Sequence, residues 1–575
     1  MHYRQRPFGK PYRRLNEILK HGCVMQSCFF VLFPPKTAHT KDMKNKREQF
    51  LDLVIYQIYP RSFYDTNGDG IGDLNGVTQK LDHLTALGVN AIWLCPCYKS
   101  PNRDNGYDVA DYRDIMTEFG TLDDWKRLRE ETKKRDIKLI MDLVFNHTSD
   151  QHFWFQEAKK SRDNPYHNYY IWADAPLNKW KSVFGGSAWA YNKQTQEYYL
   201  HSFAVEQPDL NWETPKVRKE CQAIVDFWVD MGVDGFRCDV LDFISKDFTQ
   251  NKMYNGPKLH DYIRGLFGRE KTKRIFTVGE CQSNEKDICD ICGKDRKELT
   301  TVFQFDHIHM ARKNKYRPKE FSFDKLKKIL VKWQTFCEEQ DLLYTLFTDN
   351  HDNPYFLSRT EYAKTYRYEL ATALATIFYL LKGIPFLYQT QEYGAINPYY
   401  NKVSDFNEVE TLQYYQAQRK KLPRKEVLKM LNIGSRDNTR RPFAWTESPE
   451  NHYGFSKATP WITPHSLADT INLERDKNAE KSVFRFYQNL LALRASSPCL
   501  RYGKFDDLTQ KKDTFVFTRT DKNTQFFIVC NFEKEKDIPL PISEQSHRRV
   551  LYNYTDATPY STRFRPFEIA VYEKL

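Results

Sequence analysis

The chain has 575 residues, which exceeds one ordinary domain and predicts two or three. Its formal net charge of +12 raises the question of nucleic-acid binding, but residues 1–42 hold eight Lys/Arg against two acids and carry about half of that excess. The remainder shows no basic stripe with interleaved aromatic residues, so we expect no nucleic-acid partner. Aromatic residues make up 15% of the chain and recur near its polar motifs, as in clefts that stack sugars, although core packing explains any single ring equally well.

Residues 1–42 differ from the rest because they are basic, contain proline and lack helical periodicity. Their one apolar run, 23–33, is too short for a membrane span, which needs about 20 residues, and it stops at Pro34 and Pro35. No small-residue cleavage site follows it. We expect a disordered leader, or upstream sequence before a true start at Met43; a poor signal sequence is the alternative.

The twelve cysteines form no regular framework. Cys289 and Cys292 make a single CxxC without a second pair at zinc-finger spacing, which argues against a structural zinc. Cys238 and Cys281 each lie beside a carboxylate that we consider catalytic, and thiols there suit a reducing compartment. We therefore expect a cytoplasmic protein. We also expect it to be monomeric, with no membrane partner and no organic cofactor.

Eight short apolar runs separated by helix-like segments predict a closed (β/α)8 barrel, that is, an α/β fold. The runs are 54–60, 89–96, 138–145, 234–240, 275–280, 302–305, 343–350 and 384–389. Several end in polar residues, among them Asp239, Glu280 and Asp352. One acid at a strand end is ordinary, whereas several on successive strands predict one pocket at the C-terminal face of the barrel.

Two regions lie outside this pattern. Residues 148–216 are rich in Trp, Tyr, Asn and Gly and too long for a structureless loop, so they predict a small inserted domain after the third strand. Alternating patterns such as 514–518 and 525–529 predict an all-β C-terminal domain. The expected organisation is a leader (1–42), a catalytic barrel (43–147 and 217–498), the inserted domain (148–216) and a C-terminal β-sandwich domain (499–575).

The segment 65–73 resembles an EF-hand-type calcium loop. It carries oxygen donors at alternate positions: Asp65, Asn67, Asp69, the backbone carbonyl of Ile71, and Asp73. Gly70 permits the sharp turn, but position 12 is Gly76, so the usual bidentate Glu is missing. We expect one structural Ca²⁺, or Mg²⁺ in its place; a polar turn without metal is the alternative.

The three strand-end acids suit glycosidic bond cleavage, which needs one carboxyl group to protonate the leaving oxygen and a second to attack or to activate water. Arg237 points to the same side of its strand as Asp239 and is expected to keep that carboxylate ionised as a nucleophile. Glu280 ends an apolar strand, where desolvation would raise its pKa toward that of a general acid. His147 and His351 offer neutral donors to sugar hydroxyls.

On these residues the chain resembles the α-amylase superfamily, glycoside hydrolase family 13. The resemblance covers about residues 43–575 and rests on the segments 142–147 (DLVFNH), 207–211 (QPDLN), 235–239 (GFRCD), 278–280 (VGE) and 350–352 (NHD). It implies that Asp239 is the nucleophile, that Glu280 is the acid and then the base, and that Asp352 stabilises the transition state.

The resemblance also assigns residues around the three acids. It implies that the terminal glucose is held by Tyr107, Asp108, His147, Arg237 and His351, and that 65–73 is the metal loop of the glucosidase branch. The segments 255–260, 302–306 and 435–440 resemble the oligo-1,6-glucosidases and dextran glucosidases. Val240 matches members that prefer α-1,6 links, and Arg440 matches an arginine over the mouth of the site. The branch implies an exo-acting enzyme that releases glucose from isomaltose, panose and short isomalto-oligosaccharides.

Three segments depart from the pattern: 353–355 (NPY), 388–393 (YQTQEY) and 441–445 (RPFAW). They are expected around the cleft and put the substrate's second sugar in question. The rival functions are trehalose-6-phosphate hydrolase, which would need a basic pocket for phosphate, and α-1,4-glucosidase or sucrose isomerase. The barrel-bearing heavy chains of amino-acid transporters are disfavoured, because they need a spanning helix and can lose the catalytic acids.

Overall fold

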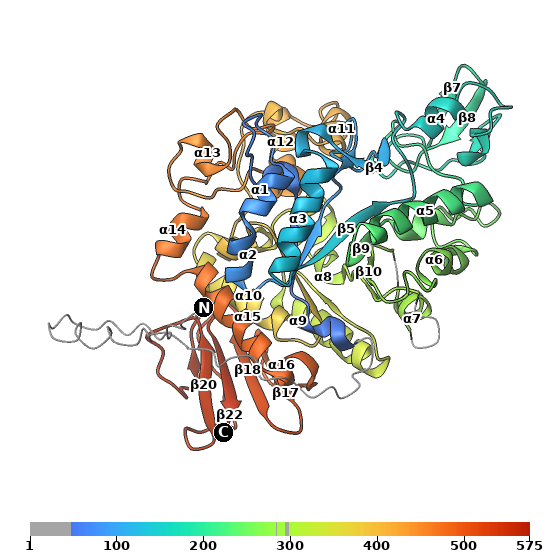
Figure 1. Cartoon of the computed structure of the whole chain (residues 1–575). Coiled ribbons are helices and arrows are strands. Elements are labelled where there is room, and N and C mark those ends of the chain that lie inside the picture. The colour runs from blue at the N-terminus through green and yellow to red at the C-terminus, as the bar shows by residue number, and fades with distance from the viewer. Residues whose placement is uncertain (1–47, 283, 294–297) are drawn as a thin grey trace, which may run out of the picture. The chain divides into compact units, whose positions relative to one another are not determined.

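The computed structural model describes residues 48–282, 284–293 and 298–575 (Figure 1). The leader predicted at 1–42, and the alternatives weighed for it, lie outside the described residues. Within the described ranges every helix is too short or too polar to cross a bilayer.

Eight parallel strands form one sheet in the order β11-β10-β9-β5-β2-β1-β15-β14. They are β1 (Ile55–Ile58), β2 (Ala91–Leu94), β5 (Lys138–Val144), β9 (Gly235–Asp239), β10 (Phe276–Gly279), β11 (Thr301–Val302), β14 (Thr345–Leu346) and β15 (Ile384–Tyr388). Each overlaps one predicted run, so the barrel is confirmed. The strands β11 and β14 are shorter than predicted, and side chains link them: Thr301 Oγ1 donates to the Leu343 carbonyl (2.5 Å) and Thr345 Oγ1 to that of Val302 (3.3 Å).

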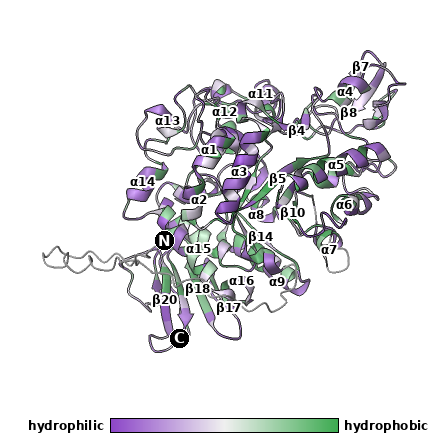
Figure 2. Ribbon diagram, viewed as in Figure 1, coloured by the Kyte–Doolittle hydropathy of each residue, from purple (hydrophilic) through white to green (hydrophobic). Residues whose placement is uncertain are grey.

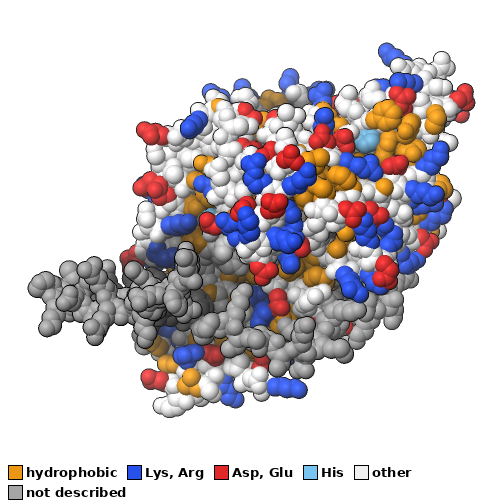
Figure 3. All heavy atoms as spheres, in the orientation of Figure 1, with side chains coloured by type: hydrophobic (Ala, Val, Ile, Leu, Met, Phe, Trp, Pro, Cys, Tyr) orange, Lys and Arg blue, Asp and Glu red, His pale blue; other side chains and the backbone are white. Residues whose placement is uncertain are grey.

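Helices lie between successive strands and cover the sheet (Figure 1). Their apolar stripes face the strands; in α3, for example, Trp125 and Leu128 are buried. Figure 2 shows hydrophilic colour on the outward faces of α1 and α3, and on the face in Figure 3 Lys/Arg and Asp/Glu side chains are interspersed. The helices up to β15 are α1 (Leu74–Gln79), α2 (Leu81–Leu87), α3 (Leu122–Lys134), α5 (Pro215–Asp230), α6 (Leu259–Phe267), α7 (Glu285–Cys292), α8 (Asp306–His309), α9 (Phe323–Glu339) and α10 (Arg367–Tyr379).

A second group of helices follows β15 and leads to the C-terminal sheet. They are α11 (Val409–Gln418), α12 (Arg424–Gly434), α13 (Asn451–Gly454), α14 (Leu473–Asn478), α15 (Val483–Ser496) and α16 (Pro498–Tyr502). Between α12 and α13 a short 3₁₀ turn, Arg436–Asn438, holds Arg436 over the carboxyl ends of the barrel strands, where it contacts Asp352.

The inserted region after β5 contains α4 (Phe153–Ala158) and a three-stranded antiparallel sheet in the order β6-β8-β7. Its strands are β6 (Trp172–Ala173), β7 (Trp189–Asn192) and β8 (Glu197–Leu200). Before it, β3 (Tyr98–Lys99) pairs with β4 (Asp111–Ile115), and beyond it β12 (Arg312–Asn314) pairs with β13 (Arg317–Pro318). The presence of a small inserted domain is thereby confirmed.

The C-terminal region is all-β, as predicted, with a five-stranded sheet in the order β16-β17-β18-β22-β20. Its strands are β16 (Lys504–Asp507), β17 (Thr514–Thr520), β18 (Gln525–Asn531), β20 (His547–Tyr552) and β22 (Ile569–Lys574); β19 (Lys536–Asp537) pairs with β21 (Arg563–Phe564). Alternate residues of β18 serve two cores: Phe526 and Ile528 pack toward the helices, whereas Phe527 and Val529 pack on Ile538.

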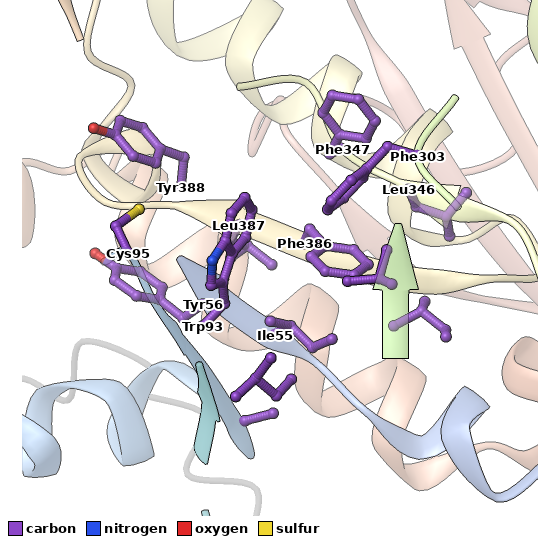
Figure 4. Close-up of a cluster of buried hydrophobic side chains, with 14 of the residues drawn as sticks. Ile55, Tyr56, Trp93, Cys95, Phe303, Leu346, Phe347, Phe386, Leu387 and Tyr388 are labelled. Carbon is purple, nitrogen blue, oxygen red and sulfur yellow. The ribbon is translucent and has the colours of Figure 1, made fainter. Parts of the chain in front are cut away.

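Aromatic rings fill the inside of the barrel (Figure 4). Phe303 is central: its ring centroid lies 5.6 Å from that of Trp93, 5.4 Å from Phe347 and 5.0 Å from Phe386. These four rings come from four different strand regions and form the floor beneath the polar residues at the carboxyl ends.

Candidate active site

The buried guanidinium of Arg237 contacts three carboxylates at the centre of the barrel. Arg237 of β9 donates through Nη1 to Asp142 (2.9 Å) and to Asp239 (2.6 Å), and through Nη2 to Glu280. The parallel register sets this contact, because Arg237 is paired with Asp142 of β5. The guanidinium carbon also lies 5.1 Å from the ring centroid of Trp93, whose Nε1 donates to Asp142 (3.1 Å). The two carboxylates expected to perform the chemistry are thus held side by side.

The electrostatics of this group correct one expectation. Burial raises the pKa of Asp239 well above its ordinary value; Arg237 opposes this, and Glu280 and Asp142 reinforce it. Burial likewise raises the pKa of Glu280, as predicted, against the pull of Arg237. Arg237 therefore offsets the effect of burial on Asp239 only in part, because three carboxylates share one guanidinium. Asp239 and Glu280 titrate together as a pair. The pair keeps one proton up to a higher pH than two separate carboxylates would.

Asp352 is surrounded differently. It accepts hydrogen bonds from Arg440 Nη2 (2.9 Å) and Arg436 Nη1 (3.2 Å), and His351 Nε2 lies 3.0 Å from its Oδ2. Burial alone would raise the pKa of Asp352, but His351, Arg436 and Arg440 together hold it well below the ordinary value. Asp352 therefore stays ionised while the other two acids share a proton, which suits a group that grips hydroxyls rather than one that transfers protons.

His351 connects this carboxylate to the barrel floor. The Gln57 amide lies 2.7 Å from His351 Nδ1 and donates to it, so the ring proton is assigned to Nε2, on the side of Asp352. The Tyr107 hydroxyl lies 2.6 Å from Nε2, and the two rings are nearly parallel with centroids 5.2 Å apart. Burial lowers the pKa of His351 to about 4, so the imidazole is a neutral donor at neutral pH.

His147 lies at the junction with the inserted domain. Its Nε2 is 3.0 Å from the Tyr107 carbonyl and 3.1 Å from the amide of Gln207, which belongs to the inserted segment. Asn146 donates to Asp209 of the same segment (3.2 Å). Burial lowers the pKa of His147 to about 4. The structure thus brings the inserted domain into the site through His147.

Asp108 takes a different place from the one expected. Its carboxylate is fully buried and accepts from the backbone N–H groups of Arg103 and Asp104 (both 2.9 Å) and from the Ser100 hydroxyl (3.0 Å). It therefore fixes a turn. The neighbouring Asp104 instead faces the site, where it contacts Arg436 Nη2 (3.0 Å) and the Gln207 amide (3.2 Å). The assignment of Asp108 to the sugar is not supported by these contacts, and Asp104 stands in its position.

Some of these residues line a narrow cavity of about 10 Å³, which is room for roughly one water molecule. Its polar lining combines Arg237, Glu280, His351 and Asp352 with Gln57, over the aromatic floor. The contacts also identify participants that were not assigned from the sequence: Gln57, Asp104, Asp142 and Arg436. Gln57 and Asp142 each carried a usable signal, a polar residue inside an apolar strand.

Hydrogen bonds from backbone N–H groups to side-chain oxygens of the same segment hold the loop 65–73 in shape. Asp65 accepts from the N–H groups of Gly68 and Gly70 (2.7 and 2.9 Å), and Asp69 from that of Ile71 (2.8 Å). Asp73 begins α1 by accepting from the Gly76 N–H (2.6 Å). The atoms that this loop offers as metal ligands are oxygens only, the type that Ca²⁺ and Mg²⁺ prefer. In the described part of the chain no three acids, histidines or cysteines are assembled at metal-binding distance.

The three segments that depart from the family pattern touch one another away from the three acids. The Tyr355 hydroxyl lies 2.7 Å from Thr390 Oγ1, and the Tyr393 ring lies 5.2 Å from that of Phe443. All four side chains are buried. The departures therefore form one repacked cluster between the loops that follow β14 and β15.

Comparison with known proteins identifies the family of this chain. The family described as "Alpha amylase, catalytic domain" matches residues 57–503. An oligo-1,6-glucosidase of Parageobacillus thermoglucosidasius is 41% identical over 92% of this chain and 99% of its own. A glucan 1,6-alpha-glucosidase of Streptococcus pneumoniae is 40% identical over 84% of this chain and 91% of its own. A solved trehalose-6-phosphate hydrolase of Bacillus licheniformis matches with a TM-score of 0.85 at 36% identity, over 91% and 99% of the two chains. The chain belongs to the α-amylase superfamily, glycoside hydrolase family 13, in the branch of the oligo-1,6-glucosidases.

Proposed function

We propose that the protein is a retaining, exo-acting α-glucosidase that hydrolyses α-1,6 bonds at the non-reducing end of isomaltose, panose and short isomalto-oligosaccharides. The observation that carries the proposal is the shared contact of Asp239 and Glu280 with Arg237. One guanidinium can contact both only if they are close, which favours the short separation of retaining enzymes (about 5–5.5 Å) over the longer one of inverting enzymes.

Two displacements follow from these positions. In the first, a carboxylate oxygen of Asp239 bonds to the anomeric carbon while the bond to the leaving oxygen breaks, and Glu280 gives its proton to that oxygen. In the second, Glu280 takes a proton from water as the water oxygen attacks the anomeric carbon, and the bond to Asp239 breaks. Arg237 balances the charge that moves between the two carboxylates.

The exo mode is supported by the polar residues beside Asp352. Arg436 is buried and bridges Asp352, Asp104 and Glu408. These groups supply donors and acceptors for hydroxyls of one terminal sugar. Ionised Asp352 accepts from those hydroxyls, and neutral His351, whose ring proton lies toward Asp352, positions that carboxylate. His147 positions the Tyr107 backbone in the same way.

The α-1,6 linkage is supported by the relatives above and by Val240. This residue follows the nucleophile with a φ of 34°, a left-handed conformation that costs a β-branched side chain free energy and is found mainly at functional positions. The main alternative is trehalose-6-phosphate hydrolase, the activity named for the solved relative; α-1,4-glucosidase is a lesser one. Glucose release from isomaltose, maltose and trehalose 6-phosphate, measured in parallel, separates them: turnover of the phosphorylated sugar alone would replace the proposed substrate.

We also propose that 65–73 binds Ca²⁺, or Mg²⁺ in its place. Asp65, Asn67, Asp69 and Asp73 would hold the ion with the Ile71 carbonyl, and the bound ion would supply structural stabilisation with no part in the reaction. A reducing compartment is supported by Cys238 and Cys281, which are free thiols beside the catalytic carboxylates. The cytoplasmic location and the monomeric state stay predictions.

A further inference from the structure

A second pocket, of about 310 Å³, lies among the described residues and shares no lining residue with the catalytic pocket. Three parts of the chain line it: the hairpin region 311–318, the loop 354–361 after β14, and the residues Asn397 and Ile433. Its most polar side chains are Arg312, Lys315 and Arg359. None of these has a role in the chemistry described above.

Two of these cations have no ion-pair partner among the described residues; the nearest acids that act on them, Glu410 on Arg312 and Asp349 on Arg359, lie farther away. Arg312 Nη1 donates to the Asn353 side chain (2.9 Å), and Arg359 Nη1 donates to the Ile308 carbonyl. Arg359 Nε is buried and makes no hydrogen bond. Among the described residues no carboxylate lies at ion-pair distance from either arginine, whereas Lys315 is paired with Glu410 (2.6 Å). The pocket wall therefore holds two arginines with unused donors.

Two fully buried arginines of this protein are held by more acceptors. Arg494 donates to four backbone carbonyls, those of Tyr379, Leu381, Gly383 and Leu500. Arg519 donates to three. Arg312 and Arg359 are half-buried and have one acceptor each, so they keep donors available to a ligand or to water.

The charge of the two arginines persists at neutral pH. Burial lowers the pKa of Arg312 to about 10, and burial together with Arg312 lowers that of Arg359 to about 9. The acid lining the pocket, Glu361, is exposed to solvent. Burial and the two arginines lower the pKa of His309 to about 4, so its imidazole adds no charge. The pocket is thus positive overall and partly desolvated, conditions in which an oxyanion binds well.

We propose that this pocket is a binding site for a phosphate group, held by Arg312 and Arg359. The guanidinium fork presents parallel N–H donors that match phosphate oxygens, and an anion would supply the direct ion-pair partner that neither arginine has among the described residues. The phosphate could be inorganic or belong to a sugar phosphate, since both present the same oxyanion. The site goes beyond the proposed hydrolysis, because its lining is separate from the catalytic pocket.

Isothermal titration calorimetry on the full chain tests this, with inorganic phosphate and glucose 6-phosphate as ligands and glucose as the uncharged control. We expect phosphate or the sugar phosphate to bind, and Arg312→Gln to weaken binding at least tenfold. Lys313→Gln removes the same charge from the adjacent, outward-facing position and should leave binding unchanged. Arg312→Lys, which keeps the charge and loses the fork, should weaken binding less than Arg312→Gln.

The outcomes separate the two sources and the proposal itself. Binding of both ligands marks a general phosphate site, and binding of glucose 6-phosphate alone marks a site for the sugar phosphate. The proposal would be overturned if neither ligand bound to the native chain. It would also be overturned if the folded variants Arg312→Gln and Arg312→Lys bound the ligand with the same affinity as each other. Isomaltose hydrolysis is measured on the same samples, so a failure here is distinguishable from a failure of the proposed activity.

Discussion

Asp239 and Glu280 are hydrogen-bonded to different nitrogens of the same guanidinium, that of Arg237. Before the reaction the nucleophile must be ionised and the acid protonated; during it Asp239 becomes an ester and Glu280 loses, then regains, its proton. A cation that touches both can balance the negative charge on either carboxylate without moving. The third carboxylate on this guanidinium, Asp142, supplies the excess negative charge that keeps a proton on the pair.

The first prediction concerns Arg237→Lys. An ammonium keeps the charge but cannot contact three carboxylates in the same plane, so we expect kcat for isomaltose to fall by roughly 10²–10³-fold, the scale of losing one preorganised donor. The control is Arg548→Lys, which alters an exposed pair with Glu573 and should leave kcat unchanged. A kcat within a few-fold of the native value in Arg237→Lys would refute the shared role of the guanidinium.

The second prediction distinguishes Asp104 from Asp108. Asp104→Asn removes a charge partner of Arg436 in the site, so kcat/KM for isomaltose should fall by roughly 10–100-fold, as expected for a lost hydrogen bond to a charged group. Asp108→Asn weakens a buried turn, so it should lower the free energy of unfolding by about 1–3 kcal/mol and leave KM unchanged. Steady-state kinetics and denaturant unfolding on both variants decide it. The reverse pattern would restore Asp108 as the sugar-binding residue.

The third prediction is a pH profile. Activity needs Asp239 deprotonated and Glu280 protonated, so kcat/KM falls at low pH as Asp239 gains a proton and at high pH as Glu280 loses one. Because burial raises both pKa values, both limbs should lie above the ordinary carboxyl range. Asp142→Asn removes a negative charge that raises both pKa values, and both limbs should therefore move to lower pH. Limbs that stay in place or move upward would contradict the charge balance described here.

The fourth prediction concerns the proposed metal. Chelation with EDTA should lower Tm, and adding Ca²⁺ back should restore it, a shift of about 1–3 °C for ligand at a hundredfold excess over Kd in a chain of this size. Asp69→Ala should abolish the effect, and Asp123→Ala, an exposed acid on α3, should preserve it. A Tm insensitive to EDTA and Ca²⁺ would leave 65–73 as a polar turn.

The strands could be predicted because each is a short apolar run, and the three acids follow from the runs that end in polar residues. Contacts between residues far apart in the sequence could not be predicted. The Arg237–Asp142 contact depends on the register between β9 and β5, so the rise in the pKa of Asp239 was missed. Asp104 and Asp108 flank Asn105 and Gly106, which have φ values of 51° and 101°. That reversal turns one carboxylate toward the site and the other into the turn, and the residue types alone do not decide which.

The measurement that tests the central claim most directly is ¹H NMR of the glucose first released from isomaltose, before mutarotation, with Asp239→Ala as the blank. A retaining double displacement through Asp239 and Glu280 predicts α-glucose from the native protein and no glucose from the variant. Release of β-glucose, or undiminished release by Asp239→Ala, would contradict the mechanism.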